Sequence, residues 1–138
     1  MARSPAEIYA EAVDRLIAAA NADARVRALW LEGASLSDLR RPYRQLRVHL
    51  ACDEPHFSAL EGDLEKILAG PGALSGPRWS DVPRFARQLE ATIEGEPVTL
   101  CFEKTSLLAK RPRAAVLALV DKTGHLPHVM DFSRTRPS

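Results

Sequence analysis

The stretch QLRVHLAC, residues 45–52, constrains the fold most strongly because its residues alternate between polar and apolar. Its apolar side consists of Leu46, Val48, Leu50 and Cys52, and its other side of Gln45, Arg47, His49 and Ala51. Successive side chains of an extended chain point to opposite faces, so a period of two predicts a β-strand with one face on a core. The chain is therefore expected to contain a sheet that is covered on one face.

The segments before this strand predict a helix and then a second strand. A helix is expected over about residues 5–22, because Ser4 suits the cap, Pro5 the first helical position, and Glu7 completes a capping box. The stretch RVRALWLEG then predicts a strand that ends at Gly33. Residues 35–44 are polar and contain Pro42, which predicts a loop.

The segments after residue 52 predict a second helix and three more strands. The helix is expected to start at Pro55, with Asp53 or Glu54 as its cap, and to end at Gly70. Residues 70–83 are rich in Gly and Pro and predict a loop. Two strands are expected around the turn EGE, and a last strand before a turn at residues 122–124. The order predicts an α+β fold, with a mixed sheet of about five strands and helices on one face.

Length and composition predict a single domain over residues 1–132, with a frayed tail at 133–138. The net charge of +1 gives no signal for a nucleic-acid partner. The longest apolar stretch, residues 114–120, is too short to span a membrane. Cys52 and Cys101 have no CxxC spacing and no preceding signal peptide, which predicts buried free thiols and a cytoplasmic location.

Residues 26–52, VRALWLEGASLSDLRRPYRQLRVHLAC, resemble the core of the nucleotidyltransferase superfamily of the DNA polymerase beta type, which includes small bacterial members. That signature is a strand, Gly-Ser, about ten residues, Asp-x-Asp on the next strand, and a third acid on a later one. The glycine lets the backbone approach a triphosphate, and the acids bind two magnesium ions that align the reaction. The resemblance extends over about residues 5–127 and implies a nucleotidyltransferase-like fold.

The residues that perform the family's chemistry are replaced in this chain. In the resemblance Gly33 matches the Gly, Ala34 the Ser, Gln45 and Arg47 the two Asp, and Thr99 the third acid. Ala34 has no hydroxyl, and Gln45 is a weak ligand for a hard cation. Arg47 is permanently positive and would repel a magnesium ion. The resemblance therefore implies a catalytically inactive protein with a binding or regulatory role and no cofactor.

Arginine in place of acids converts a metal site into an anion site, which predicts metal-independent binding of a nucleotide or phosphate. The candidate residues are Gly33, Ala34, Arg44 and Arg47. The alternative is that Arg40, Arg41 and Arg44 form a solvated loop face, with Asp38 as counter-charge. A small open sheet also leaves edges to cover, so a protein partner or a homodimer is a further expectation.

Two other interpretations stay open from the sequence. One is an active nucleotidyltransferase that uses magnesium and displaced acids, such as Asp38, Asp53 or Glu103, to transfer a nucleoside monophosphate to a small molecule or a protein. The other is an unrelated α+β domain. Glu103 and Asp121, at strand ends, are expected to be surface acids, and Trp30 is expected to pack in the core. A zinc site is disfavoured because His49 and Cys52 have opposite parity on one strand.

Overall fold

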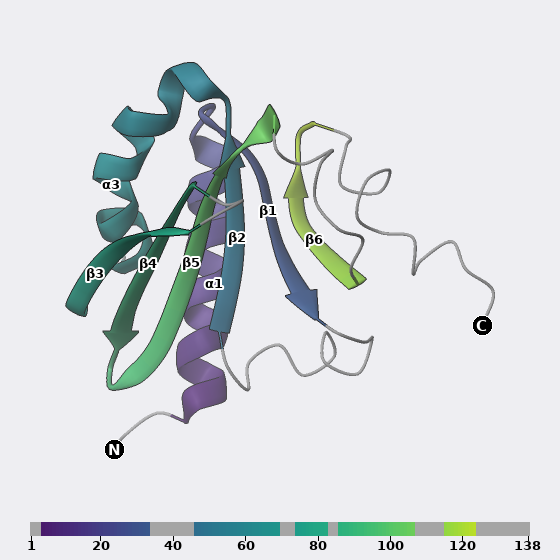
Figure 1. Ribbon diagram of the computed structural model, residues 1–138. Helices are drawn as coiled ribbons and strands as arrows, with labels where there is room; N and C mark the ends of the chain where they lie inside the picture. The colour runs from purple at the N-terminus through teal and green to yellow at the C-terminus, as the bar shows by residue number, and fades with distance from the viewer. Residues whose placement is uncertain (1–3, 34–45, 70–73, 83–85, 107–114, 124–138) are drawn as a thin grey trace.

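A computed structural model describes residues 4–33, 46–69, 74–82, 86–106 and 115–123 of the chain. These residues form a six-stranded mixed sheet with two α-helices on one face (Figure 1). The elements are α1 (Pro5–Ala22), β1 (Val26–Gly33), β2 (Leu46–Cys52), the 3₁₀ turn η2 (Glu54–His56), α3 (Phe57–Ala69), β3 (Ser75–Val82), β4 (Ala86–Ile93), β5 (Glu96–Lys104) and β6 (Ala115–Asp121). The predicted α+β class, mixed sheet and one-sided helices are confirmed.

The strands lie in the order β3-β4-β5-β2-β1-β6. Every neighbouring pair is antiparallel except β2 and β5, which run parallel at the centre of the sheet. A parallel pair needs a long crossover, and here α3 and the β3–β4 hairpin lie between the two strands in the chain. No helix in the described ranges has both the length and the apolar character needed to cross a membrane.

The helix α1 begins and ends with side-chain contacts to its free backbone groups. Ser4 Oγ accepts a hydrogen bond from Glu7 N at 3.2 Å, and Ser4 N donates to Glu7 Oε1 at 3.3 Å, which confirms the predicted capping box. No basic residue lies in the last turn of α1. Instead, Lys122 Nζ donates to Ala20 O at 2.6 Å and to Asp23 O at 3.1 Å, so the residue after β6 completes this helix end.

The start of the second helix differs from the prediction. The turn η2 covers Glu54–His56, and α3 begins only at Phe57. Asp53 takes the cap position of η2, but its side chain makes no capping hydrogen bond. Its Oδ1 accepts from Thr105 Oγ1 at 2.7 Å instead, because β2 and β5 end side by side. The predicted stop at Gly70 lies outside the described residues.

The prediction of a loop over residues 70–83 is wrong for Ser75–Val82, which form β3 and raise the strand count to six. Gly76, with φ of +58°, and Pro77 lie at a register shift between Ser75 and Arg78, where the ladder with β4 is interrupted. Proline and glycine are tolerated there because β3 is an edge strand and the shift is a bulge.

The β4–β5 connection and the last strand agree with the prediction. Glu94 and Gly95 form a two-residue turn with φ of 51° and 84°, the positive values that tight hairpins require. After β6, Asp121 Oδ1 accepts from Thr123 N at 3.1 Å, which begins the expected turn. The other predicted features, at Gly124, in the loop over 35–44 and in the tail over 133–138, lie outside the described residues.

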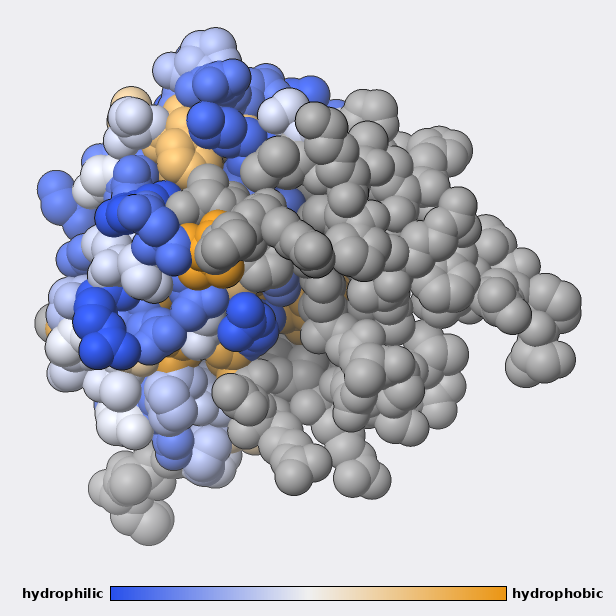
Figure 2. All heavy atoms as spheres, in the orientation of Figure 1, coloured by the Kyte–Doolittle hydropathy of each residue, from blue (hydrophilic) through white to orange (hydrophobic). Residues whose placement is uncertain are grey.

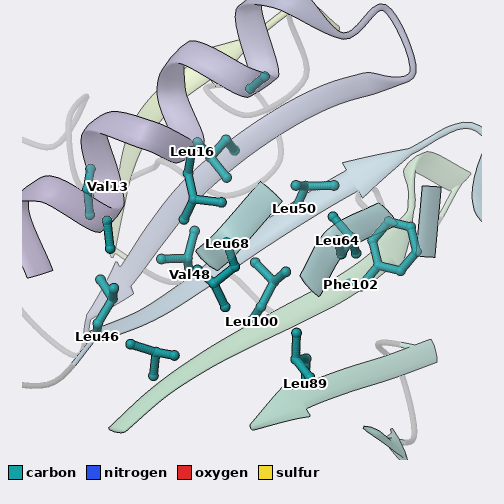
Figure 3. Packing of buried hydrophobic residues seen from close by; sticks show 14 of the residues in the cluster. Val13, Leu16, Leu46, Val48, Leu50, Leu64, Leu68, Leu89, Leu100 and Phe102 are labelled. Atoms are coloured by element: carbon teal, nitrogen blue, oxygen red, sulfur yellow. The ribbon is translucent and has the colours of Figure 1, made fainter. Parts of the chain in front are cut away.

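The core lies between the helices and one face of the sheet (Figure 3). The side chains that meet there are Val13 and Leu16 of α1, Leu64 and Leu68 of α3, Leu46, Val48 and Leu50 of β2, Leu89 of β4, and Leu100 and Phe102 of β5. Tyr9 of α1 joins this layer and donates from its hydroxyl to Pro97 O at 2.9 Å, which ties the start of β5 to the helix. The opposite face of the sheet carries the polar residues of β3, β4 and β5 that alternate with the core residues, such as Arg78, Glu90 and Thr99.

Candidate functional site

The sheet face opposite the helices carries a row of polar residues that crosses four strands. Arg47 of β2 is the register partner of Thr99 of β5, Thr99 that of Glu90 of β4, and Glu90 that of Arg78 of β3. Their neighbours in β2, β4 and β5 belong to the helix-side core, and Trp79, next to Arg78 in β3, packs against that core, so these four side chains share the other face. We call them the polar rung. Figure 2 views this face, where hydrophilic residues cover much of the side of β3 and β4.

The structure brings together two of the positions that the resemblance singled out. Arg47 is exposed at the start of β2, and Thr99 lies directly beside it. Gly33 ends β1 and pairs with Ala115 of β6, on the side of β1 away from β2. The remaining predicted positions, Ala34, Arg44 and Gln45, lie outside the described residues.

The side chain of Arg47 reaches across β5 to β4. Its Nη2 donates to Gln88 Oε1 at 3.4 Å, and Gln88 Nε2 donates to Glu90 Oε1 at 2.7 Å. Glu90 Oε2 in turn accepts from Arg78 Nη2 at 3.1 Å. The hydrogen bond from Arg78, followed by that from Gln88, lowers the pKa of Glu90, and the charge of Arg47 acts in the same direction. Glu90 is therefore held ionised between two arginines.

Arg47 differs from the other described arginines in its partner. Each of the others lies within 4.0 Å of at least one carboxylate: Arg15, Arg25, Arg27, Arg78 and Arg87. Among the described residues, Arg47 contacts only a neutral amide, and at the long distance of 3.4 Å. A guanidinium with no carboxylate partner retains donors and charge for an anion from solution.

A hollow of about 480 Å³ opens beside the polar rung. It is lined by Ser75, Gly76, Arg78, Glu90, Ala91, Thr92, Pro97, Val98 and Thr99. Thr99 thus belongs both to the wall of the hollow and to the position next to Arg47. This hollow could not be predicted from the sequence, because it depends on β3, whose residues predict a loop.

Further along the same face the side chains become buried. His49 stacks on Trp30 with ring centroids 5.3 Å apart, and its Nδ1 lies 3.7 Å from Glu103 Oε2. Cys101 is the register partner of His49, and all four side chains are almost fully inaccessible. The prediction that Glu103 is a surface acid is therefore wrong, since it is 0% exposed. Trp30 is buried as expected, but on the face away from the helices.

The acids of the alternative enzyme interpretation do not come together with the polar rung. Asp53 contacts Thr105 and lies 3.8 Å from Arg27 Nε, beyond the end of β2. Glu103 lies beneath His49, and Asp38 is outside the described residues. Within the described ranges, no three His, Cys, Asp or Glu side chains form a group that could hold a metal ion. Cys52 lies in the helix-side core, on the other face from His49.

The chain matches no protein-family model, no curated protein and no solved structure. What can be proposed for it comes from its own residues.

Proposed function

We propose that this protein binds a phosphate-bearing ligand, such as a nucleotide, through Arg47, without a metal ion and without catalysing nucleotidyl transfer. The observation that carries the proposal is the environment of Arg47: it is exposed, lies beside the Thr99 hydroxyl, and has a neutral amide as its partner among the described residues. Charge-assisted hydrogen bonds from arginine to phosphate are short, strong and often bidentate.

The polar rung is better suited to an anion than to a magnesium ion. Its one acid, Glu90, is engaged by Gln88 and Arg78, and arginines flank it on both sides. A dication within ~4 Å of the Arg47 guanidinium would be repelled by several kcal/mol at a surface-like dielectric. The register pairing of Arg47 with Thr99 supports the proposed relation to nucleotidyltransferases, because two of the positions that the resemblance matches to acids lie side by side.

The proposal is tested by isothermal titration of the whole protein with inorganic phosphate and with ATP, each with and without magnesium. We expect both ligands to bind when magnesium is chelated. Arg47→Ala should weaken binding about tenfold or more, because it removes a charge-assisted contact. Lys66→Ala is the matched control: it removes one positive charge from an exposed position of α3, on the other side of the sheet, and should leave binding unchanged.

Three results would contradict this proposal. Binding that depends strictly on magnesium, together with release of pyrophosphate from ATP, would support the enzyme with displaced acids. Equal affinity of Arg47→Ala and the unaltered protein would place the ligand elsewhere. The absence of any phosphate binding would favour a protein partner or a second copy of the chain as the ligand.

A further inference from the structure

The hollow beside Arg47 lies between two consecutive rows of the sheet. One row is formed by Thr99, Glu90 and Arg78, and the next by Pro97, Thr92 and Ser75, which are also register partners. The side chains of Ala91 and Val98, between the rows, belong to the helix-side core, so these residues contribute backbone to the floor. The register shift at Gly76 widens the β3 side, where a Cβ atom on Gly76 would meet nothing within 4 Å.

Five of the nine residues that line the hollow have hydrogen-bonding side chains, namely Ser75, Arg78, Glu90, Thr92 and Thr99. Thr92 Oγ1 donates to Ser75 O at the long distance of 3.4 Å. Glu90 accepts one bond at each oxygen, and a carboxylate has room for about four in total. Among the described residues that line the hollow none is aromatic, so none of them offers a stacking surface for a planar base. Hydroxyl and carboxylate groups arranged in this way suit a ligand that is rich in hydroxyl groups.

Thr99 joins this hollow to the anion position. It lies between Arg47 and Glu90, whose Cα atoms are separated by two strand spacings, about 10 Å. Glu90 repels a phosphate and Arg47 attracts one, so a ligand with a phosphate at one end and hydroxyls at the other has one favourable orientation. We propose that the ligand is a sugar phosphate, with its phosphate at Arg47 and its sugar in the hollow against Glu90, Thr92 and Thr99. This inference rests on the proposed function.

The test compares ribose 5-phosphate with inorganic phosphate by isothermal titration, without magnesium. We expect ribose 5-phosphate to bind about tenfold more tightly, the gain from one or two hydrogen bonds to a charged acceptor. Thr92→Val and Glu90→Gln keep the shape of the side chains and should bring the ratio of the two dissociation constants toward one. Thr105→Val is the matched control, since Thr105 bonds Asp53 away from the hollow, and it should keep the full ratio.

The outcomes separate this inference from the function on which it rests. Equal binding of phosphate and ribose 5-phosphate, both weakened by Arg47→Ala, would overturn the sugar site and leave the anion site standing. Binding of adenosine 5′-monophosphate but not of ribose 5-phosphate would assign recognition to the base and would also overturn the inference. If neither phosphate nor ribose 5-phosphate binds, the proposed function and the sugar site both fail.

Discussion

Arg47 and Cys52 occupy the two ends of β2 and illustrate how the face of a strand decides the chemistry of a residue. Arg47 points away from the helices, is exposed, and is available to solvent anions. Cys52 points into the helix-side core and is 0% exposed. The alternation in the sequence predicted both orientations. It did not predict that His49, which shares the face of Arg47, would be buried, because alternation indicates a face and not what covers it.

The thiol of Cys52 should make the stability of the protein depend on pH in the alkaline range. Burial, and then the charge of Asp53, raise its pKa from 9.0 to about 11. The folded state therefore holds the thiol proton more tightly than the unfolded state does, so this stabilisation is complete below about pH 9 and is lost as the pH rises toward 11. Between about pH 8 and pH 10, the unfolding free energy of the unaltered protein should fall about 1 kcal/mol more than that of Cys52→Ala.

Urea denaturation at both pH values measures this difference. Cys52→Ala is the reference because it keeps every other titrating group, including Tyr9, whose pKa is raised by burial. Parallel pH profiles for the two proteins would show that the thiol titrates alike in the folded and unfolded chains.

The boundaries of helices and strands differ in how well they can be predicted from residues that are close in the sequence. The start of α1 was predicted from Ser4, Pro5 and Glu7, which are close together in the sequence, because a capping box is a local contact. The start of α3 was misplaced because Asp53 bonds Thr105, 52 residues away. Similarly, β3 is a strand only because β4 pairs with it, and its Gly and Pro suit an edge bulge as well as a loop.

The end of α1 depends on a contact that no local pattern indicates, and Lys122→Met should show its contribution. The substitution keeps the apolar stem but removes the ammonium group that bonds Ala20 O and Asp23 O. We expect a loss of about 1–2 kcal/mol in unfolding free energy, because charged hydrogen bonds to a helix C-terminus are lost. Lys104→Met is the matched control, since Lys104 pairs with the exposed carboxylate of Glu54 and lies over the Phe57 ring, and it should cost less than about 1 kcal/mol.

Urea denaturation of both variants, with helix content followed by circular dichroism, provides the measurement. Equal losses for the two lysines would mean that the contacts of Lys122 contribute no more than a surface ion pair.

The candidate site belongs to the whole sheet, and this is why the sequence predicted only part of it. The resemblance singled out Arg47 and Thr99, which are 52 residues apart in the chain and adjacent in the fold. Gln88, Glu90 and Thr92 were not singled out, because they join the site only through the pairing of β4 with β5. Register between strands distant in the sequence is fixed by the packing of the entire core, and a single sequence carries little local signal for it.

The same packing predicts where the sheet tolerates change. Leu100 lies on the central strand β5, 0% exposed, whereas Leu117 lies on the edge strand β6 and is 41% exposed. Leu100→Ala should lower the unfolding free energy by about 2–5 kcal/mol, because it removes buried methyl groups and leaves a cavity. Leu117→Ala makes the same chemical change at the periphery and should cost less than about 1 kcal/mol.

Denaturant unfolding of both variants measures the two losses in unfolding free energy. The comparison uses the same slope m of free energy against denaturant concentration for both variants. Because Leu100 is flanked along β5 by Thr99 and Cys101, whose side chains face the opposite side of the sheet, its truncation should leave the proposed anion site intact in molecules that remain folded. A cost at Leu117 as large as that at Leu100 would contradict a core that lies between the helices and the central strands. Such a result would indicate that Leu117 makes stabilising contacts beyond the pairing of β6 with β1.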